Sequence, residues 1–135
     1  MSDKKTVLIV TDGTEKTVKM AGDIAKALKG HKVSIREASA FAGTDLLPAQ
    51  VLFFGCGESS PPSFEYLYEM LGHINLAGRS CGVFSPSSAK AGKYLTQMVK
   101  SSEITLNPEI LTEANLSGLS EWAAKVIACG NHCEP

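Results

Sequence analysis

Apolar positions along the chain follow two patterns, short runs of strand length and longer stretches with helical spacing. Continuous apolar runs at 6–10, 51–55 and 80–84 predict strands that are covered on both faces. The segment 32–36 alternates apolar and polar residues, which predicts a half-exposed strand. A short fifth strand is predicted at 104–106, ended by the Asn-Pro pair that follows, because proline cannot donate to a β-ladder.

Helical spacing between these strands predicts four amphipathic helices, while 38–50 has little periodicity and predicts at most a short helix. Gly30 ends the first helix, and Pro61 and Pro62 suit the start of the second. The expected buried stripes are Val18, Ala21, Ile24, Ala25 and Leu28; Phe64, Leu67, Tyr68 and Leu71; Ala91, Leu95, Met98 and Val99; and Leu116, Leu119, Trp122, Ala123, Val126 and Ile127. Right-handed crossovers between successive strands then give an α/β fold, a three-layer α/β/α doubly wound parallel sheet.

Composition and charge narrow the class of protein. The 135 residues are expected to form a single domain, 1–135, and 44% hydrophobic and 20% charged residues are ordinary for a globular protein. A net charge of -1 gives no reason to expect a nucleic-acid or membrane partner. Four unevenly spaced cysteines and a polar start without a signal sequence lead us to expect reduced thiols and a cytoplasmic location.

The first strand runs directly into a polar loop, Thr11-Asp12-Gly13-Thr14-Glu15-Lys16-Thr17. In a parallel sheet this loop lies at the carboxyl end of a strand and at a helix N-terminus, where free N–H groups and the helix dipole attract an anion, most often a phosphate. Glu15 places a negative charge in the same loop. Two interpretations remain, a phosphate site and a loop that caps the first helix through Asp12 or Thr14.

Three segments together carry a resemblance to a known family. The first resembles the entry into the fourth strand of flavodoxins and consists of Asn75-Leu76-Ala77-Gly78-Arg79-Ser80-Cys81-Gly82-Val83-Phe84-Ser85. The segment 51–55 resembles the third strand of the family. The segment 64–67 resembles the helix after that strand, especially in the flavodoxin modules of flavodiiron proteins. The resemblance covers nearly the whole chain. It implies strand order 2-1-3-4-5, with flavin mononucleotide (FMN) bound non-covalently at the switch point between the first and third strands.

The same resemblance implies which residues contact FMN. The phosphate would lie against Thr11, Asp12, Gly13, Thr14, Lys16 and Thr17, and Lys16 would offset the charge of Glu15. The flavin ring would lie between two loops. The first consists of Cys56, Gly57, Glu58 and Ser59, and the second of Ser85, Pro86, Ser87 and Ser88. The segment 85–92 lacks the aromatic residue that flavodoxins usually stack on the flavin, and Tyr94 comes one helical turn late. An ordinary strand-to-helix connection remains the alternative interpretation of the loop at Cys56.

Two functions are therefore open. One is a flavoprotein that carries electrons between redox partner proteins, as a monomer or weak homodimer and without a substrate of its own. The other is a flavodoxin-fold protein that has lost FMN and acts as a binding or scaffold module. Cys129, His132 and Cys133 lack the second cysteine pair of a zinc module, so no metal site is expected there.

Overall fold

A five-stranded sheet in the order β2-β1-β3-β4-β5 forms the centre of the molecule, and every strand pair in it is parallel. The computed structural model describes residues 5–40, 48–58, 62–86, 89–100, 102–107 and 109–132. The strands are β1 (Thr6–Thr11), β2 (Lys32–Glu37), β3 (Val51–Gly55), β4 (Ser80–Phe84) and β5 (Thr105–Leu106). This order is the one that the resemblance implied.

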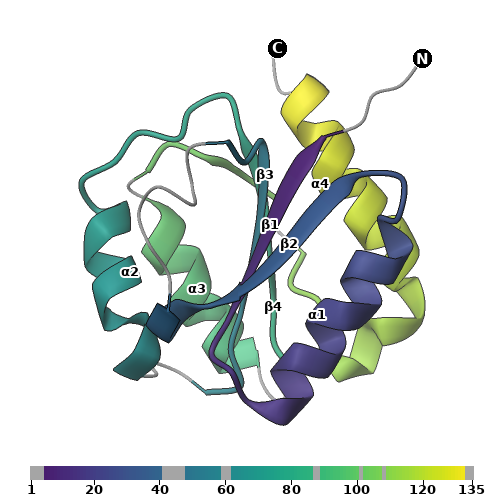
Figure 1. Ribbon diagram of the computed structural model, residues 1–135, viewed down its shortest axis with the longest axis horizontal. Helices are drawn as coiled ribbons and strands as arrows, with labels where there is room; N and C mark the ends of the chain where they lie inside the picture. The colour runs from purple at the N-terminus through teal and green to yellow at the C-terminus, as the bar shows by residue number, and fades with distance from the viewer. Residues whose placement is uncertain are drawn as a thin grey trace.

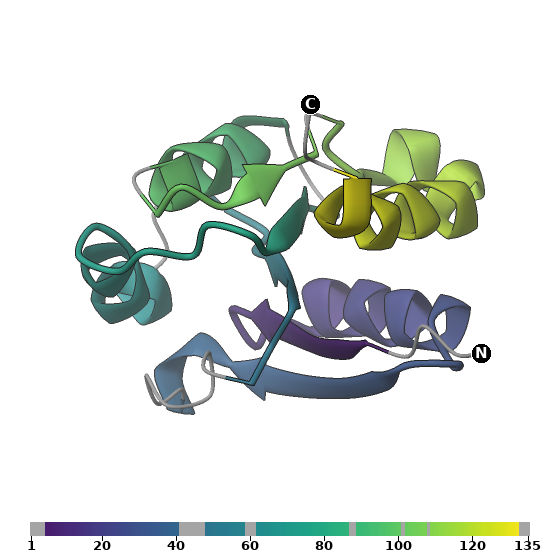
Figure 2. The same ribbon diagram turned by 90° about the horizontal axis from the view of Figure 1, so that it is seen from above.

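Two pairs of helices cover the sheet. The helices are α1 (Glu15–Ala27), α2 (Glu65–Leu71), α3 (Ala89–Lys100) and α4 (Leu119–His132). Short 3-10 turns lie at Ala38–Ala40, Pro62–Phe64 and Glu113–Gly118. Helices α1 and α4 lie on one face of the sheet and α2 and α3 on the other, as Figures 1 and 2 show from two directions. The predicted three-layer architecture is confirmed.

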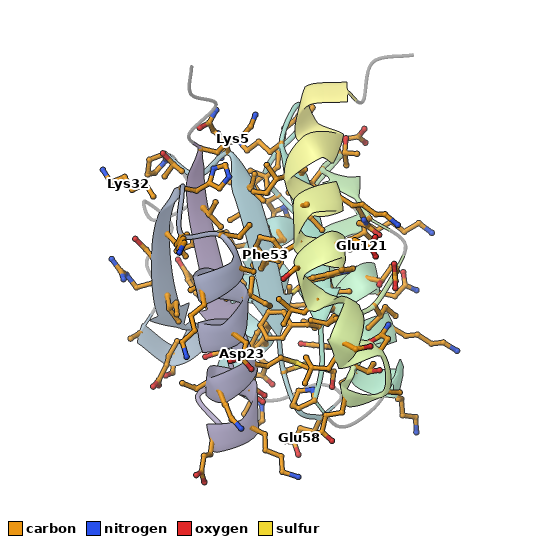
Figure 3. The ribbon with its side chains drawn as sticks, turned by 90° about the vertical axis from the view of Figure 1, so that its right-hand side faces the viewer. Lys5, Asp23, Lys32, Phe53, Glu58 and Glu121 are labelled. Atoms are coloured by element: carbon orange, nitrogen blue, oxygen red, sulfur yellow. The ribbon has the colours of Figure 1, made fainter. Side chains whose placement is uncertain are left out.

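Alternation along the central strands explains why the sheet is buried on both faces. In β1, Leu8 and Val10 belong to the core under α2 and α3, whereas Val7 and Ile9 belong to the core under α1 and α4. The strand β3 repeats this alternation. Its Phe53 packs on Trp122 with ring centroids 5.3 Å apart, and Figure 3 shows Phe53 behind α1 and α4. Trp122 is therefore the core residue that the sequence predicted.

Two helix faces differ from prediction. Val18 is 40% exposed, so its assignment to the buried stripe of α1 was wrong; the stripe begins instead at Thr17 and continues through Met20. Tyr68 is 38% exposed, because its ring packs beside Tyr94 at the surface of the α2–α3 pair rather than in the core. The last helix begins at Leu119, and Leu116 lies in the preceding 3-10 turn.

The chain leaves β1 toward β2 on one side and returns to β3 on the other, which makes the β1–β3 boundary the topological switch point. In α/β sheets, ligands bind in the crevice at the carboxyl ends of the strands near this point. Figure 3 shows Glu58 at that end of the molecule, opposite Lys5 and Lys32 at the amino ends of β1 and β2. The candidate site is built there.

Candidate functional site

Three strand-to-helix loops meet at the carboxyl edge of the sheet, after β1, β3 and β4. The register of the sheet brings them together, because Thr11 pairs with Gly55 and Gly55 pairs with Phe84 at the strand ends. In Figure 1 the turn from β1 into α1 lies at the lower end of the sheet. Residues more than seventy positions apart in the sequence thus border one region.

The loop after β1 leads into α1 without a capping side chain. Thr14 occupies the N-cap position in extended conformation, and its side chain makes no capping bond to the first turn. Its hydroxyl is turned instead toward the Asp12 carboxylate (2.8 Å) and the Thr17 hydroxyl (2.8 Å). Of the two N-cap candidates from the sequence, Thr14 and not Asp12 occupies the position. The positive end of the α1 dipole therefore faces the loop.

The Asp12 carboxylate accepts three hydrogen bonds from the loops after β1 and β3. Its Oδ1 accepts from the Thr14 N–H (3.1 Å) and the Thr14 hydroxyl (2.8 Å), and its Oδ2 accepts from the Gly57 N–H (2.9 Å). The bond to Gly57 joins two loops that are 45 residues apart in the sequence. This half-exposed carboxylate is an oxyanion held by donors from two loops, which we call the oxyanion cradle: the Thr14 N–H, the Thr14 hydroxyl and the Gly57 N–H.

Gly13 gives the loop its turn. Its φ of +81° lies in the left-handed region that glycine adopts without strain. A Cβ atom at this position would also lie 3.0 Å from Oε1 of Glu37, the last residue of β2. The Gly13 N–H donates to the buried Thr11 hydroxyl (3.2 Å), so that hydroxyl stabilises the turn.

The loop after β3 begins with a buried thiol. Cys56 is fully buried, and its Sγ donates to the carbonyl oxygen of Glu58 (3.1 Å). Burial, followed by the negative charge of Asp12, raises the pKa of Cys56 to about 12. Because the thiolate is the reactive form of cysteine, this environment favours a packing role over a redox role for Cys56.

The loop after β4 contributes Ser85 and Pro86, both buried. The Ser85 N–H donates to the carbonyl oxygen of Leu111 (2.8 Å), which fixes the start of the loop. Tyr94 lies farther along α3, and its ring centroid is 5.2 Å from that of Tyr68. Tyr94 is partly buried against the core under α2 and α3, and burial is the main cause that raises its pKa to about 12.

A hollow of about 340 Å³ lies between these loops. A second hollow of about 360 Å³ adjoins it and shares Glu15, Lys16 and Pro86. Ligand pockets have volumes from about 300 to 1,000 Å³, so the two hollows are of suitable size. None of the described residues that line the first hollow is aromatic. They are Asp12, Thr14, Glu15, Lys16, Gly57, Glu58 and Pro86.

The structure brings only part of the predicted residue set to this hollow. Asp12, Thr14, Lys16, Gly57, Glu58 and Pro86 line it. The side chains of Thr11, Thr17, Cys56 and Ser85 are buried in the fold and do not line it. Gly13 is exposed beside Glu37 and does not line it either. Ser59, Ser87 and Ser88 lie outside the described residues.

Sequence reasoning missed several residues that border the site. Glu37 lies beside Gly13, and the second hollow is also lined by Lys19, Met20, Asp23, Glu113 and Leu116. Helical spacing from Glu15 contains a signal for Lys19, which lies one turn farther along α1. Glu37 and Glu113 had no such signal, because sheet register and the packing of a distant 3-10 turn place them.

Two further observations limit the chemistry within the described part of the chain. No group of three or more histidine, cysteine, aspartate or glutamate side chains there is arranged to hold a metal ion. Among the described helices, none is long and apolar enough to cross a bilayer. The side chain of Cys129 and the whole of Cys133 fall outside what the structure describes.

Comparison with known proteins places the fold. No family model and no curated protein matches the chain. Among solved structures, a flavodoxin from Streptococcus pneumoniae TIGR4 superposes with a TM-score of 0.79 at 20% identity, over 91% of this chain and 97% of that one. A Fusobacterium nucleatum flavodoxin bound to flavin mononucleotide gives 0.71 at 14% identity, over 92% and 95% of the two chains.

A multidomain protein shows the same likeness. The flavodiiron core of Flv1 from Synechocystis sp. PCC6803 gives a TM-score of 0.73 at 17% identity, over 97% of this chain and 37% of that one. Flavodoxins and a flavodiiron core were the two groups that the sequence resembled. Strand order, layers and these superpositions agree, and the chain has the flavodoxin-like fold.

Proposed function

We propose that this protein binds FMN non-covalently at the carboxyl edge of the sheet and carries electrons between redox partner proteins. The observation that carries the proposal is the oxyanion cradle, where donors from two loops converge on a carboxylate next to the start of α1. Hydrogen-bond donors at a helix N-terminus suit a phosphate for the same reasons that they suit this carboxylate. The group fits the donor set, provided that the Asp12 side chain moves aside.

Each part of the site has a distinct role in the proposal. Thr14 and Gly57 would donate to the phosphate, while the exposed Lys16 would balance its charge. The loops at Gly57 and Pro86 would border the flavin and exclude water from it. Bound FMN would supply the electron chemistry, since the flavin accepts and releases electrons.

Exposed carboxylates around the hollow bear on the choice of partner. Glu15 and Glu58 are exposed and line the hollow together. A negative rim steers positively charged surfaces toward it and increases the rate of encounter. The proposed partners are therefore redox proteins with a basic docking surface. This chain would bind them as a monomer or weak homodimer.

A second candidate is a flavodoxin-fold binding module without flavin. It is favoured by the lining of the hollow, in which three carboxylates face one lysine and no described residue is aromatic. Repulsion between an exposed carboxylate of this kind and a phosphate would cost up to ~1 kcal/mol each. Loss of ring stacking would remove ~1 kcal/mol more.

Flavin binding by the full-length chain separates the two candidates. The purified protein is incubated with excess FMN, desalted, and examined by its visible spectrum, followed by a titration of FMN fluorescence. The proposal expects a retained flavin band and a dissociation constant in the micromolar range or below, equivalent to about 8 kcal/mol. A colourless protein that leaves FMN fluorescence unchanged at high protein concentration would establish the flavin-free module.

A further inference from the structure

We propose that the Asp12 carboxylate is an internal competitor of the ligand phosphate, so that Asp12 sets the affinity of this site for phosphorylated ligands. The inference rests on the proposed function, because it takes the competing phosphate to be that of FMN. It gives Asp12 an inhibitory role, which flavin binding by itself does not require. In this role Asp12 occupies the oxyanion cradle and must leave it before a phosphate can enter.

The first support is the number and origin of the bonds to Asp12. Both carboxylate oxygens are engaged, Oδ1 by Thr14 and Oδ2 by the Gly57 N–H at 2.9 Å. The bond to Gly57 joins the loop after β1 to the loop after β3, so it is a long-range contact and not part of a local turn at Asp12. While these three bonds exist, the donors of the oxyanion cradle are not open to a phosphate.

The second support is the contrast with the neighbouring carboxylates. Glu15 and Glu58 line the same hollow and carry the same charge. Within the described part of the chain their side-chain oxygens accept no hydrogen bond, whereas Asp12 accepts three. The two glutamates therefore act on an incoming anion through charge alone, while Asp12 acts through charge and occupancy.

Occupancy has a quantitative consequence. When only a fraction of molecules is competent to bind, the apparent dissociation constant is raised by the inverse of that fraction. If Asp12 fills the cradle in about nine molecules of ten, its removal lowers the dissociation constant for a phosphorylated ligand about tenfold. A ligand that lacks the phosphate does not compete with Asp12 and gains nothing by this mechanism.

The test compares Asp12→Ala and Asp12→Asn with Glu15→Gln as the matched control, using FMN and riboflavin as ligands. We expect Asp12→Ala to lower the FMN dissociation constant about tenfold, Asp12→Asn to lower it less because one acceptor oxygen remains, and Glu15→Gln to have the smallest effect. Riboflavin affinity should not change. Proton–nitrogen correlation spectra establish that each variant is folded and follow the Gly57 and Thr14 amides directly.

Several results would overturn the inference. These are an equal gain in Glu15→Gln, an equal gain for riboflavin, or unchanged or weaker FMN binding in both Asp12 variants. If no variant binds FMN, the proposed function fails, and inorganic phosphate decides the inference. Shifts of the Gly57 and Thr14 amides on phosphate addition in the Asp12 variants but not in the wild type would uphold the competition; no shifts in any variant would refute it.

Discussion

At the scale of single residues, Lys16 is the cation that the proposed site depends on most. It is exposed and lines both hollows beside Glu15. Under the proposed function, Lys16→Gln should weaken FMN binding up to about fivefold, since an exposed charge pair contributes up to ~1 kcal/mol. Titration of flavin fluorescence at low and high salt measures the change, which should shrink as salt screens the charges.

Lys19→Gln is the control for this prediction. Lys19 is equally exposed and lies one turn farther along α1, where it lines only the second hollow. Its replacement changes the net charge by the same amount but should leave the FMN affinity nearly unchanged. Equal losses in the two variants would mean that Lys16 acts through the overall field of the protein and does not contact the phosphate.

The thiol of Cys56 should make the free energy of unfolding decrease as the pH rises into the alkaline range. Its pKa is raised from an ordinary 9.0 to about 12, mainly by burial. Between these values the unfolded chain loses a proton that the folded protein keeps. The contribution of Cys56 is therefore complete below pH 9 and is lost as the pH rises toward 12, by ~1.4 kcal/mol per pH unit. Urea unfolding at pH 7, 9 and 10 measures this slope.

Cys56→Ala isolates that contribution from other groups with raised pKa values, such as the buried Cys81 and Tyr94. The free energy of unfolding of the variant should fall less steeply between pH 9 and 10 than that of the wild type. Parallel pH profiles for the two proteins would show that Cys56 ionises in the folded state as easily as in the unfolded chain.

At the scale of elements, the sequence contained enough information for the sheet and its layers, but not for every helix face. Apolar runs mark β1, β3 and β4 because both faces of a central parallel strand are buried. The stripe of α1 was misplaced because its first member is Thr17, a polar residue. Its hydroxyl is buried and bonded to that of Thr14, so hydrophobicity alone could not identify it.

The candidate site was predictable to a similar degree. Placing three loops at one edge follows from parallel topology, and six of the predicted residues do line the hollow. The bond between Asp12 and the Gly57 N–H was not predictable, because it depends on the register of β1 against β3 across 45 residues. The position of Glu37 beside Gly13 likewise depends on the register of β2 against β1.

The packing of Gly55 in β3 against Phe84 in β4 leaves no room for a side chain and can be tested by mutation. A Cβ atom on Gly55 would lie 2.2 Å from Cε2 of Phe84, a rigid aromatic ring. Gly55→Ala should therefore push the strand ends apart and lower the free energy of unfolding by about 1–3 kcal/mol. Urea denaturation measures the loss, and FMN binding should weaken with it because Gly55 leads directly into the loop at Gly57.

Gly22→Ala is the matched control on α1. Nothing lies within 4 Å of a Cβ atom there, so the added methyl group meets no neighbour. Alanine is favoured over glycine in a helix interior by ~0.8–1 kcal/mol, and this variant should be more stable than the wild type. If Gly55→Ala were as stable as Gly22→Ala, Phe84 would have to turn aside without loss of packing.

At the scale of the whole molecule, ligand binding and stability are linked, because a ligand that binds only the folded state stabilises it. With FMN at a hundred times its dissociation constant, the free energy of unfolding should rise by ~2.7 kcal/mol. For a chain of this length that corresponds to a rise in Tm on the order of 10 °C. Thermal unfolding with and without FMN measures it.

Riboflavin separates the contribution of the phosphate from that of the ring. The loops that line the hollow offer hydrogen-bond donors and a lysine but no described aromatic side chain, so most of the affinity should come from the phosphate end. We therefore expect riboflavin at the same concentration to raise Tm far less than FMN. Equal shifts would mean that the ring is bound without the oxyanion cradle, and no shift with either ligand would mean that neither flavin binds the folded protein.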